Sequence, residues 1–118
     1  MKLNIQLFGL DQYISNSDGE EVYLRKANQI QGFFEERGLA ENCKQIHVPK
    51  KVMLELISNI KAVLSQHDLA DELLPATPGF FYGSYEYDDW YFEQLEEVLP
   101  ELEALIKPNA KYYYYCWY

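Results

Sequence analysis

The sequence predicts one α+β domain over residues 1–118, in which a small, mostly antiparallel sheet is covered by two or three helices. Three observations predict it. The length of 118 residues is that of a single domain. Apolar and polar residues alternate near both ends of the chain, as in half-buried strands. Between the ends, apolar residues recur every three or four positions, as in amphipathic helices.

The N-terminal region is predicted to form strands and a tight turn. Residues 2–8 place Leu3, Ile5 and Leu7 on one side, which is the pattern of a strand with one buried face. Residues 12–15 either continue this strand or form a second one. The polar residues 15–19 then predict a turn, because Asp and Gly are typical of its tightest point.

Two helices and a short strand are expected next. Residues 22–37 are predicted as the first helix because apolar residues recur there at helical spacing, and Gly38 stands where a glycine often ends a helix. Residues 44–48 indicate a short strand. Pro49 is expected at the first position of the second helix, which runs to about residue 66 and has the clearest apolar stripe in the chain. Residues 68–74 add a short helical turn.

The third long helix is predicted to begin near Asp88, whose carboxylate can accept hydrogen bonds from the free amides of the first turn. Apolar residues fall on one side of this helix and acidic residues on the other. The apolar side comprises Tyr91, Leu95, Val98, Leu99, Leu102, Leu105 and Ile106. Pro100 lacks an amide hydrogen and is expected to kink the helix or divide it in two. Residues 111–118 alternate as a final, tyrosine-rich strand.

The net charge of −9 arises in the second half of the chain. Residues 1–61 contain eight basic and eight acidic residues, whereas the stretch between Lys61 and Lys107 contains eleven acidic residues and no Lys or Arg. This asymmetry predicts a one-sided negative field, which repels nucleic acid and anionic membranes and attracts basic protein surfaces. A charged face that serves only solubility is the alternative.

No motif in the sequence indicates catalysis or metal binding. Neither His47 nor His67 has a nucleophile or a second ligand at the spacing that such sites need. Acidic neighbours such as Asp88 and Asp89 point about 100° apart on a helix and seldom converge on one substrate atom. We therefore predict a protein that is not an enzyme and that has no metal and no cofactor.

The compartment expected from the sequence is the cytoplasm. Cys43 and Cys116 have no metal-binding or redox spacing, so reduced thiols are expected, although a disulfide between them stays open. The N-terminus is too short and too polar for a signal peptide, and no run approaches the length of a membrane span. The sequence leaves the oligomeric state undetermined.

Five segments in a consistent order resemble a family of small, mostly uncharacterised phage and prophage proteins. They are Gly9-Leu-Asp-Gln-Tyr-Ile, Tyr23-Leu-Arg-Lys-Ala-Asn-Gln-Ile, Leu74-Pro-Ala-Thr-Pro-Gly-Phe-Phe-Tyr-Gly-Ser, Tyr87-Asp-Asp-Trp-Tyr-Phe and Tyr113-Tyr-Tyr-Cys-Trp. The sequence departs from the family pattern in a few extra residues before Gly9 and in Cys116, where a serine is usual. The resemblance implies a phage or prophage origin and action in a bacterial host cell. Some members are labelled phosphoglycerate kinase, an activity that one domain without a phosphate-binding loop cannot support.

The preferred interpretation is an acidic phage accessory protein that binds and inhibits a host protein with a basic surface, without binding nucleic acid or membrane itself. The predicted contact residues lie at and after the start of the third helix: Glu86, Asp88, Asp89, Trp90, Glu93, Glu96 and Glu97. A tryptophan among carboxylates is typical of a binding hot spot, and its alternative is that Trp90 folds back onto residues 80–85. Acids on successive helical turns recur about every 5–6 Å, close to the phosphate spacing of DNA. A DNA-mimic inhibitor of a nucleic-acid-binding complex, such as a CRISPR or restriction system, is therefore one version.

A small-ligand binding protein is the alternative function. It would hold a nucleotide or another anionic metabolite near Arg25, in a site formed by basic, amide and aromatic side chains. The candidate residues are Tyr13, Tyr23, Arg25, Lys26, Asn28 and Tyr115. The competing interpretation is an exposed helix face with ordinary ion pairs.

Overall fold

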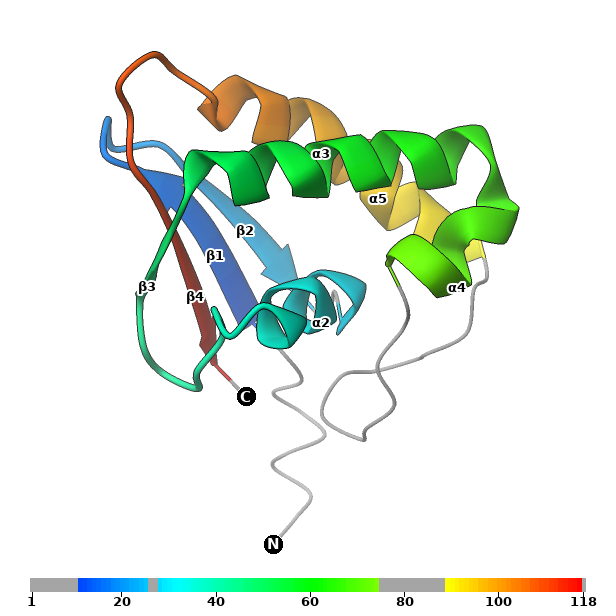
Figure 1. The fold of residues 1–118 in the computed structure, drawn as a ribbon, viewed down its shortest axis with the longest axis horizontal. Helices are drawn as coiled ribbons and strands as arrows, with labels where there is room; N and C mark the ends of the chain where they lie inside the picture. Colours follow the sequence, from blue (N-terminus) through cyan, green and yellow to red (C-terminus); the bar gives the residue numbers. More distant parts are fainter. Residues whose placement is uncertain (1–10, 26–27, 75–88, 118) are drawn as a thin grey trace, which may run out of the picture.

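A four-stranded antiparallel sheet with helices on one side forms the molecule (Figure 1). The computed structural model describes residues 11–25, 28–74 and 89–117. The sheet has the strand order β2-β1-β4-β3, so the N-terminal hairpin pairs with the C-terminal strand. Its strands are β1 (Asp11–Asn16), β2 (Glu21–Arg25), β3 (Ile46–Val48) and β4 (Tyr112–Trp117). The predicted α+β class with a small antiparallel sheet is confirmed.

The helices of the described residues are two long ones and several shorter ones. They are α2 (Asn28–Glu36), α3 (Lys50–Ser65), the 3₁₀ turn η1 (His67–Leu69), α4 (Ala70–Leu73) and α5 (Asp89–Leu105). The apolar stripe of α3 forms the predicted buried face, and α3 packs along α5. Pro49 is the N-cap of α3 and not, as predicted, its first helical residue; the first helical residue is Lys50.

The covered face of the sheet builds the core together with the helices. Alternate residues of each strand point into it, among them Ile14, Leu24 and Tyr114. The Phe34 ring of α2 stacks on the Tyr114 ring, with 4.1 Å between centroids and 22° between planes. The Tyr114 hydroxyl donates a 2.5 Å hydrogen bond to Oε1 of the buried Gln12, which gives this polar pair a partner inside the core.

The prediction of one helix over residues 22–37 is wrong in its first part. Residues Glu21–Arg25 form β2, and the helix begins at Asn28. In β2, Val22 and Leu24 are buried while Tyr23 is exposed, which is the period of a strand. Residues 22–25 are too few to distinguish the period of a helix from that of a strand. Pairing with β1 favours the strand because it gives the backbone groups of both strands hydrogen-bond partners. Gly38 does end this region, with the positive φ of 72° expected of a glycine cap.

Pro100 does not divide the last helix. Helix α5 runs without a break from Asp89 to Leu105 with Pro100 inside it. Proline removes one backbone hydrogen bond from a helix. Val98 and Leu102, on either side of Pro100, are buried in the core, and this packing holds both halves in one helix.

The strand at β3 is also shorter than the predicted 44–48, and the strand predicted at residues 2–8 lies outside the described residues.

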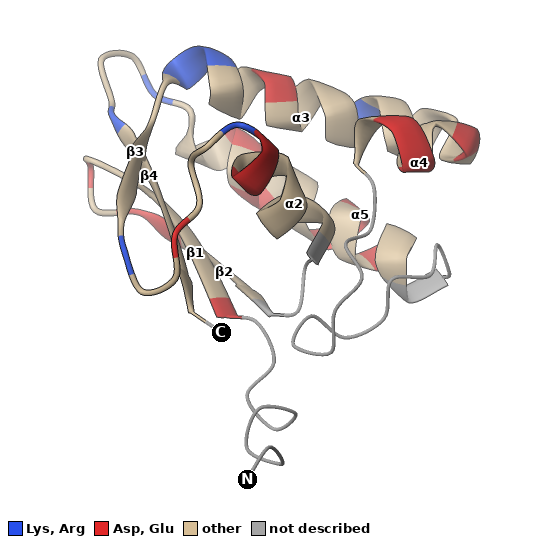
Figure 2. Cartoon of the chain, turned by 60° about the horizontal axis from the view of Figure 1, so that its bottom comes forward, with Lys and Arg blue, Asp and Glu red and all other residues tan. Residues whose placement is uncertain are grey.

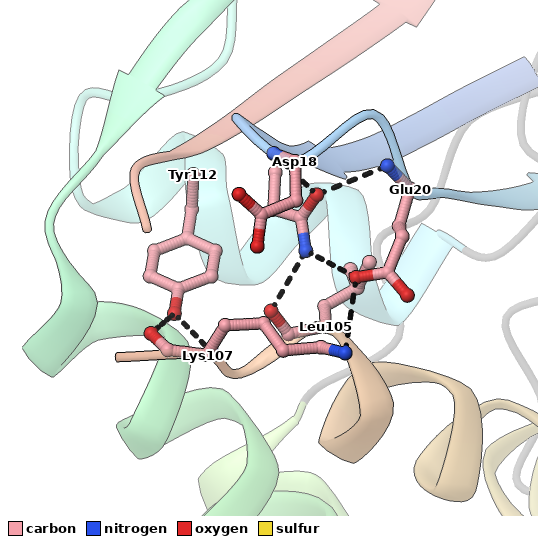
Figure 3. A network of polar contacts seen from close by, with 6 residues as sticks. Asp18, Glu20, Leu105, Lys107 and Tyr112 are labelled. Atoms are coloured by element: carbon pink, nitrogen blue, oxygen red, sulfur yellow. Dashed lines mark hydrogen bonds and ion pairs between the residues drawn. The ribbon is translucent and has the colours of Figure 1, made fainter. Parts of the chain in front are cut away.

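A polar network fixes the β1–β2 turn to the loop between α5 and β4 (Figure 3). The buried Asn16 side chain accepts hydrogen bonds from the amides of Asp18 and Glu20, at 3.1 and 3.0 Å. Its amide group donates to the Leu105 carbonyl at 3.0 Å and to Glu20 Oε1 at 2.9 Å. The Glu20 carboxylate also lies 3.5 Å from Lys107 Nζ. One asparagine therefore joins two segments that are far apart in the sequence.

Cys43 is exposed, Cys116 is buried, and both are free thiols. Among the residues that the structure describes, no helix is both long enough and apolar enough to cross a membrane.

Candidate functional site

The face of the sheet opposite the helices carries a row of three tyrosines. The strand register places Tyr23 of β2 beside Tyr13 of β1, and Tyr13 beside Tyr115 of β4. Because side chains alternate along a strand, all three point away from the helical layer. The Tyr13 ring lies 5.1 Å from the Tyr23 ring and 6.1 Å from the Tyr115 ring, with tilts of 39° and 43°. We call these three residues the tyrosine row.

Two further rows flank the tyrosine row on this open face. On one side, Asp11 pairs in register with Arg25 and with Trp117. On the other side, Ser15 pairs in register with Glu21 and with Tyr113, and Tyr113 pairs with His47. The His47 and Tyr113 rings meet edge to face at 5.8 Å. The open face therefore presents five aromatic side chains and one imidazole from four adjacent strands.

This face exposes large aromatic surface. Tyr23 is 51% exposed and Trp117 is 40% exposed, and Tyr13, Tyr113 and Tyr115 are partly exposed. Among the described residues, the one other exposed large apolar side chain is Leu54 on α3. Tyrosine and tryptophan side chains that gather at one surface are typical of interfaces, because they combine a large apolar area with a polar group that tolerates water.

Polar contacts hold parts of the open face in place. The Tyr23 hydroxyl donates a 2.6 Å hydrogen bond to Asp11 Oδ1, which links the tyrosine row to the next row. Partial desolvation and the neighbouring Cys43 raise the pKa of Tyr115 above its ordinary value. A side-chain hydrogen bond with Cys43 contributes to the same shift, so the Tyr115 hydroxyl already has a partner.

The carboxylates predicted as partner contacts on α5 are exposed. Glu93, Glu96 and Glu97 point to solvent, and within the described part of the chain no Lys or Arg lies at ion-pair distance from them. Further along α5, Glu103 is paired with Lys61 of α3 at 2.8 Å, so the negative side of this helix is partly neutralised at its C-terminal end. Figure 2 shows acidic positions along α5 and α4 and basic positions at the start of α3.

Some residues of the predicted partner-binding set and of the predicted ligand-binding set are not among the described residues. Glu86, Asp88 and Lys26 are outside the described residues. Helix α5 begins at Asp89, but the side chains of Asp89 and Trp90 also fall outside the described part, so the orientation predicted for Trp90 stays a prediction.

The predicted ligand set is partly brought together. Tyr13, Tyr23 and Tyr115 come from three strands and form the tyrosine row, as a shared site requires. The side chains of Arg25 and Asn28 are outside the described part, and their backbones place them at the end of β2 and at the start of α2. For Arg25, the basic residue of that predicted site, the structure therefore gives the position in the fold and not the side-chain contacts.

Tyr113, Trp117 and His47 were missed by the sequence reasoning. The signal for the first two was present, because Tyr113, Tyr115 and Trp117 occupy alternate positions of the predicted final strand and must share a face. Which face the helices leave open could not be read from alternation, because both faces of β4 contain tyrosines. His47 joins the cluster through the pairing of β3 with β4, which no local pattern indicates.

The rest of the described surface offers little for chemistry. His67 stacks on Phe92 at 3.7 Å with 9° between the rings, a packing contact at the end of α3. Within the described ranges, no group of three or more His, Cys, Asp or Glu side chains is placed to hold a metal ion. Comparison with known proteins found no matching family model, no matching curated protein and no matching solved structure.

Proposed function

We propose that this is a phage or prophage accessory protein that acts in the bacterial cytoplasm by binding a host protein, without catalysis. The observation that carries the proposal is the open face of the four-stranded sheet, where Tyr23 and Trp117 are exposed and Tyr13 and Tyr115 are partly exposed. The origin and the compartment rest on the resemblance of the five sequence segments.

Energetic arguments support a protein interface at this face. Tyr and Trp dominate binding hot spots, and truncating a hot-spot side chain costs about 2 kcal/mol or more of binding free energy. These aromatic side chains also lose little conformational entropy on binding because few bonds rotate. The strands below hold each ring in register, so a partner would meet an organised surface.

The charge argues for a basic partner. With a net charge of −9, the protein repels phosphate backbones, and sheets that bind single-stranded nucleic acid combine aromatic side chains with a positive groove. A host protein with a basic surface is attracted instead. The exposed carboxylates Glu93, Glu96 and Glu97 add long-range attraction, which raises the association rate. Inhibition of a nucleic-acid-handling host complex by occupation of its DNA-binding groove, as by a DNA mimic, fits this charge pattern.

A pull-down from host lysate at low and high salt tests the proposal. The variant Tyr13→Ala with Tyr115→Ala is expected to lose a partner that the natural protein retains, while Leu54→Ala, which removes exposed apolar surface on α3, retains it. Partner binding that survives the double tyrosine change would refute a role of the open face.

The acidic face of α5 has its own test. Glu93→Lys with Glu97→Lys should slow association and reduce the salt dependence of binding, because two steering charges are reversed. Asp68→Lys with Glu72→Lys makes the same change in net charge on η1 and α4 and is the matched control. Equal effects of the two pairs would show that total charge acts rather than α5.

A second candidate function is binding of a nucleotide or another anionic metabolite. The observation that favours it is that the three tyrosines predicted for that site do form one row, with the Arg25 position in the next row. Nucleotides should then raise the melting temperature, and Arg25→Ala should remove this effect. Unchanged melting temperatures across a nucleotide panel would eliminate this candidate.

A further inference from the structure

We infer that Cys43 and Cys116 are a redox pair, which forms a reversible intramolecular disulfide when a small-molecule disulfide oxidises the protein. The bond joins the loop between α2 and β3 to the end of β4. Both residues are free thiols in this structure, which is the reduced form of the pair.

The backbones of the two cysteines are in direct contact. The Cys43 amide donates a 2.7 Å hydrogen bond to the Cys116 carbonyl, and an isolated parallel bridge pairs Asn42 with Cys116. The loop before β3 thus lies beside the end of β4 (Figure 1). Covalent geometry keeps the Cα atoms of two residues joined in this way within about 6.6 Å of each other. Disulfides join Cα atoms that are roughly 4.4–6.8 Å apart, so the two backbones are close enough for the bond.

Both sulfur atoms contact the same short stretch, residues 41–43. Cys116 Sγ lies 3.7 Å from the Glu41 carbonyl oxygen, and Cys43 Sγ lies 3.5 Å from Asn42 Oδ1. They lie on different sides of this stretch. Cys116 is buried, whereas Cys43 is exposed and is hydrogen-bonded to Tyr115 of the open face. The Cys43 side chain therefore has to turn before the two sulfurs meet.

A shift of the bridge by one residue turns Cys43 to the side of Cys116. Asn42 stands opposite Cys116, and neighbouring residues of an extended segment point to opposite faces. After the shift, Cys43 stands opposite Cys116 and points to the same face. Residues 41–45 are all exposed, so the shift breaks little packing. Cys43 also has a φ of 63°, in the left-handed region that residues with side chains rarely adopt, and an extended conformation relieves this strain.

The bond forms by two thiol–disulfide exchanges. The Cys43 thiol loses its proton, and its sulfur attacks the small-molecule disulfide, keeps one half as a mixed disulfide and releases the other half as a thiol. The Cys116 sulfur, deprotonated in turn, attacks the Cys43 sulfur and releases the second small thiol. The two protein thiols lose two electrons and two protons, and the small-molecule disulfide takes up both.

The different surroundings of the two thiols set the order of these steps. Cys43 is exposed, so it meets the oxidant first. Burial raises the pKa of the Cys116 thiol and keeps it from the oxidant until the bridge shifts. The finished bond takes Cys43 away from the Tyr115 hydroxyl and closes a long loop, residues 43–116, which restricts the unfolded chain.

Oxidation of the full chain by mixtures of oxidised and reduced glutathione tests the inference. Mass spectrometry should find a monomer that is lighter by two hydrogen atoms and inert to a thiol-alkylating reagent, and dithiothreitol should restore both thiols. The ratio of disulfide to dithiol should be about tenfold higher in the folded chain than in urea, because the fold holds the two cysteines together. A ratio in the folded chain equal to or below that in urea would overturn the inference, as would a disulfide-linked dimer as the main product.

Serine variants separate the roles of the two thiols. Cys116→Ser, whose hydroxyl can still donate to the Glu41 carbonyl, should stop at the mixed disulfide on Cys43. Cys43→Ser should not react in the folded state, because Cys116 is buried. Oxidation should raise the melting temperature of the natural protein by about 5 °C and leave that of Cys43→Ser unchanged. A mixed disulfide that persists on Cys43 in the natural protein would show that Cys116 does not resolve it and would refute the pair.

Discussion

The two faces of strand β4 use the same residue type for different purposes. Tyr112 and Tyr114 point into the core, where their hydroxyls bind Lys107 backbone atoms and the Gln12 side chain. Tyr113 and Tyr115 point to the open face and are partly exposed. Four consecutive tyrosines therefore divide into two that hold the fold together and two that are offered to a partner. The lesson is that the location of the helices, and not the residue type, assigns the role of each side chain.

The largest expected effect is on the covered face. Tyr114→Ala removes a fully buried ring that stacks on Phe34 and leaves the buried Gln12 without this hydrogen bond. The free energy of unfolding should fall by about 3–5 kcal/mol, as for other large buried aromatic residues. Urea unfolding measures it. Tyr114→Phe keeps the ring and should lose only about 1–3 kcal/mol. Equal losses in both variants would mean that the hydroxyl, rather than the packing, matters.

Asn16 should show the next largest effect. Asn16→Ala removes the side-chain contacts with Glu20, Asp18 and Leu105 shown in Figure 3, and leaves the buried Leu105 carbonyl without its amide donor. We expect a loss of about 1–3 kcal/mol in unfolding free energy. Ser15→Ala, one residue earlier and on the open face, is the control and should stay within about 0.5 kcal/mol. A large loss for Ser15→Ala would contradict the contrast between the two faces.

Tyr115→Ala should affect stability little and partner binding strongly. Its ring is partly exposed and contacts Tyr13 at the edge of a row rather than inside the core. The loss of unfolding free energy should be about 1 kcal/mol or less, the size of a strand-propensity difference. Thermal melting and a partner-binding assay on the same sample measure both effects. A stability loss as large as that of Tyr114→Ala would mean that the open face is structural.

The smallest expected effect concerns pH. The Asn16 hydrogen bond, helped by Lys107, lowers the pKa of Glu20 below its ordinary value of 4.5. A carboxyl group whose pKa is lowered by folding stabilises the protein above the unfolded-state pKa, and this contribution is lost as the pH falls through the folded-state pKa. Glu20→Gln should therefore melt slightly lower than the natural protein at pH 7 and nearly equally at pH 3. A difference that grows towards acid would contradict the assignment.

Local patterns predicted most of the elements. The stripes of α3 and α5 and the alternation of β4 each span enough residues to fix their period, and Gly38 marks the end of α2 by its own conformational preference. The helix prediction was wrong for residues 22–25 because a segment of four residues fits the period of a helix and that of a strand. Pairing with β1, a contact between segments, decided between the two. The continuity of α5 through Pro100 was decided in the same way, by packing around Val98 and Leu102.

The sequence by itself determined the residue chemistry of this protein: an excess of carboxylates in the later half and tyrosines on alternate positions of its last strand. Only the tertiary structure decided which tyrosines face outward, that three of them meet across β2, β1 and β4, and that Lys61 neutralises one acid of α5. The physical reason is that hydrophobic burial is collective. A strand with apolar bodies on both faces has no preferred inner side until helices cover one of them.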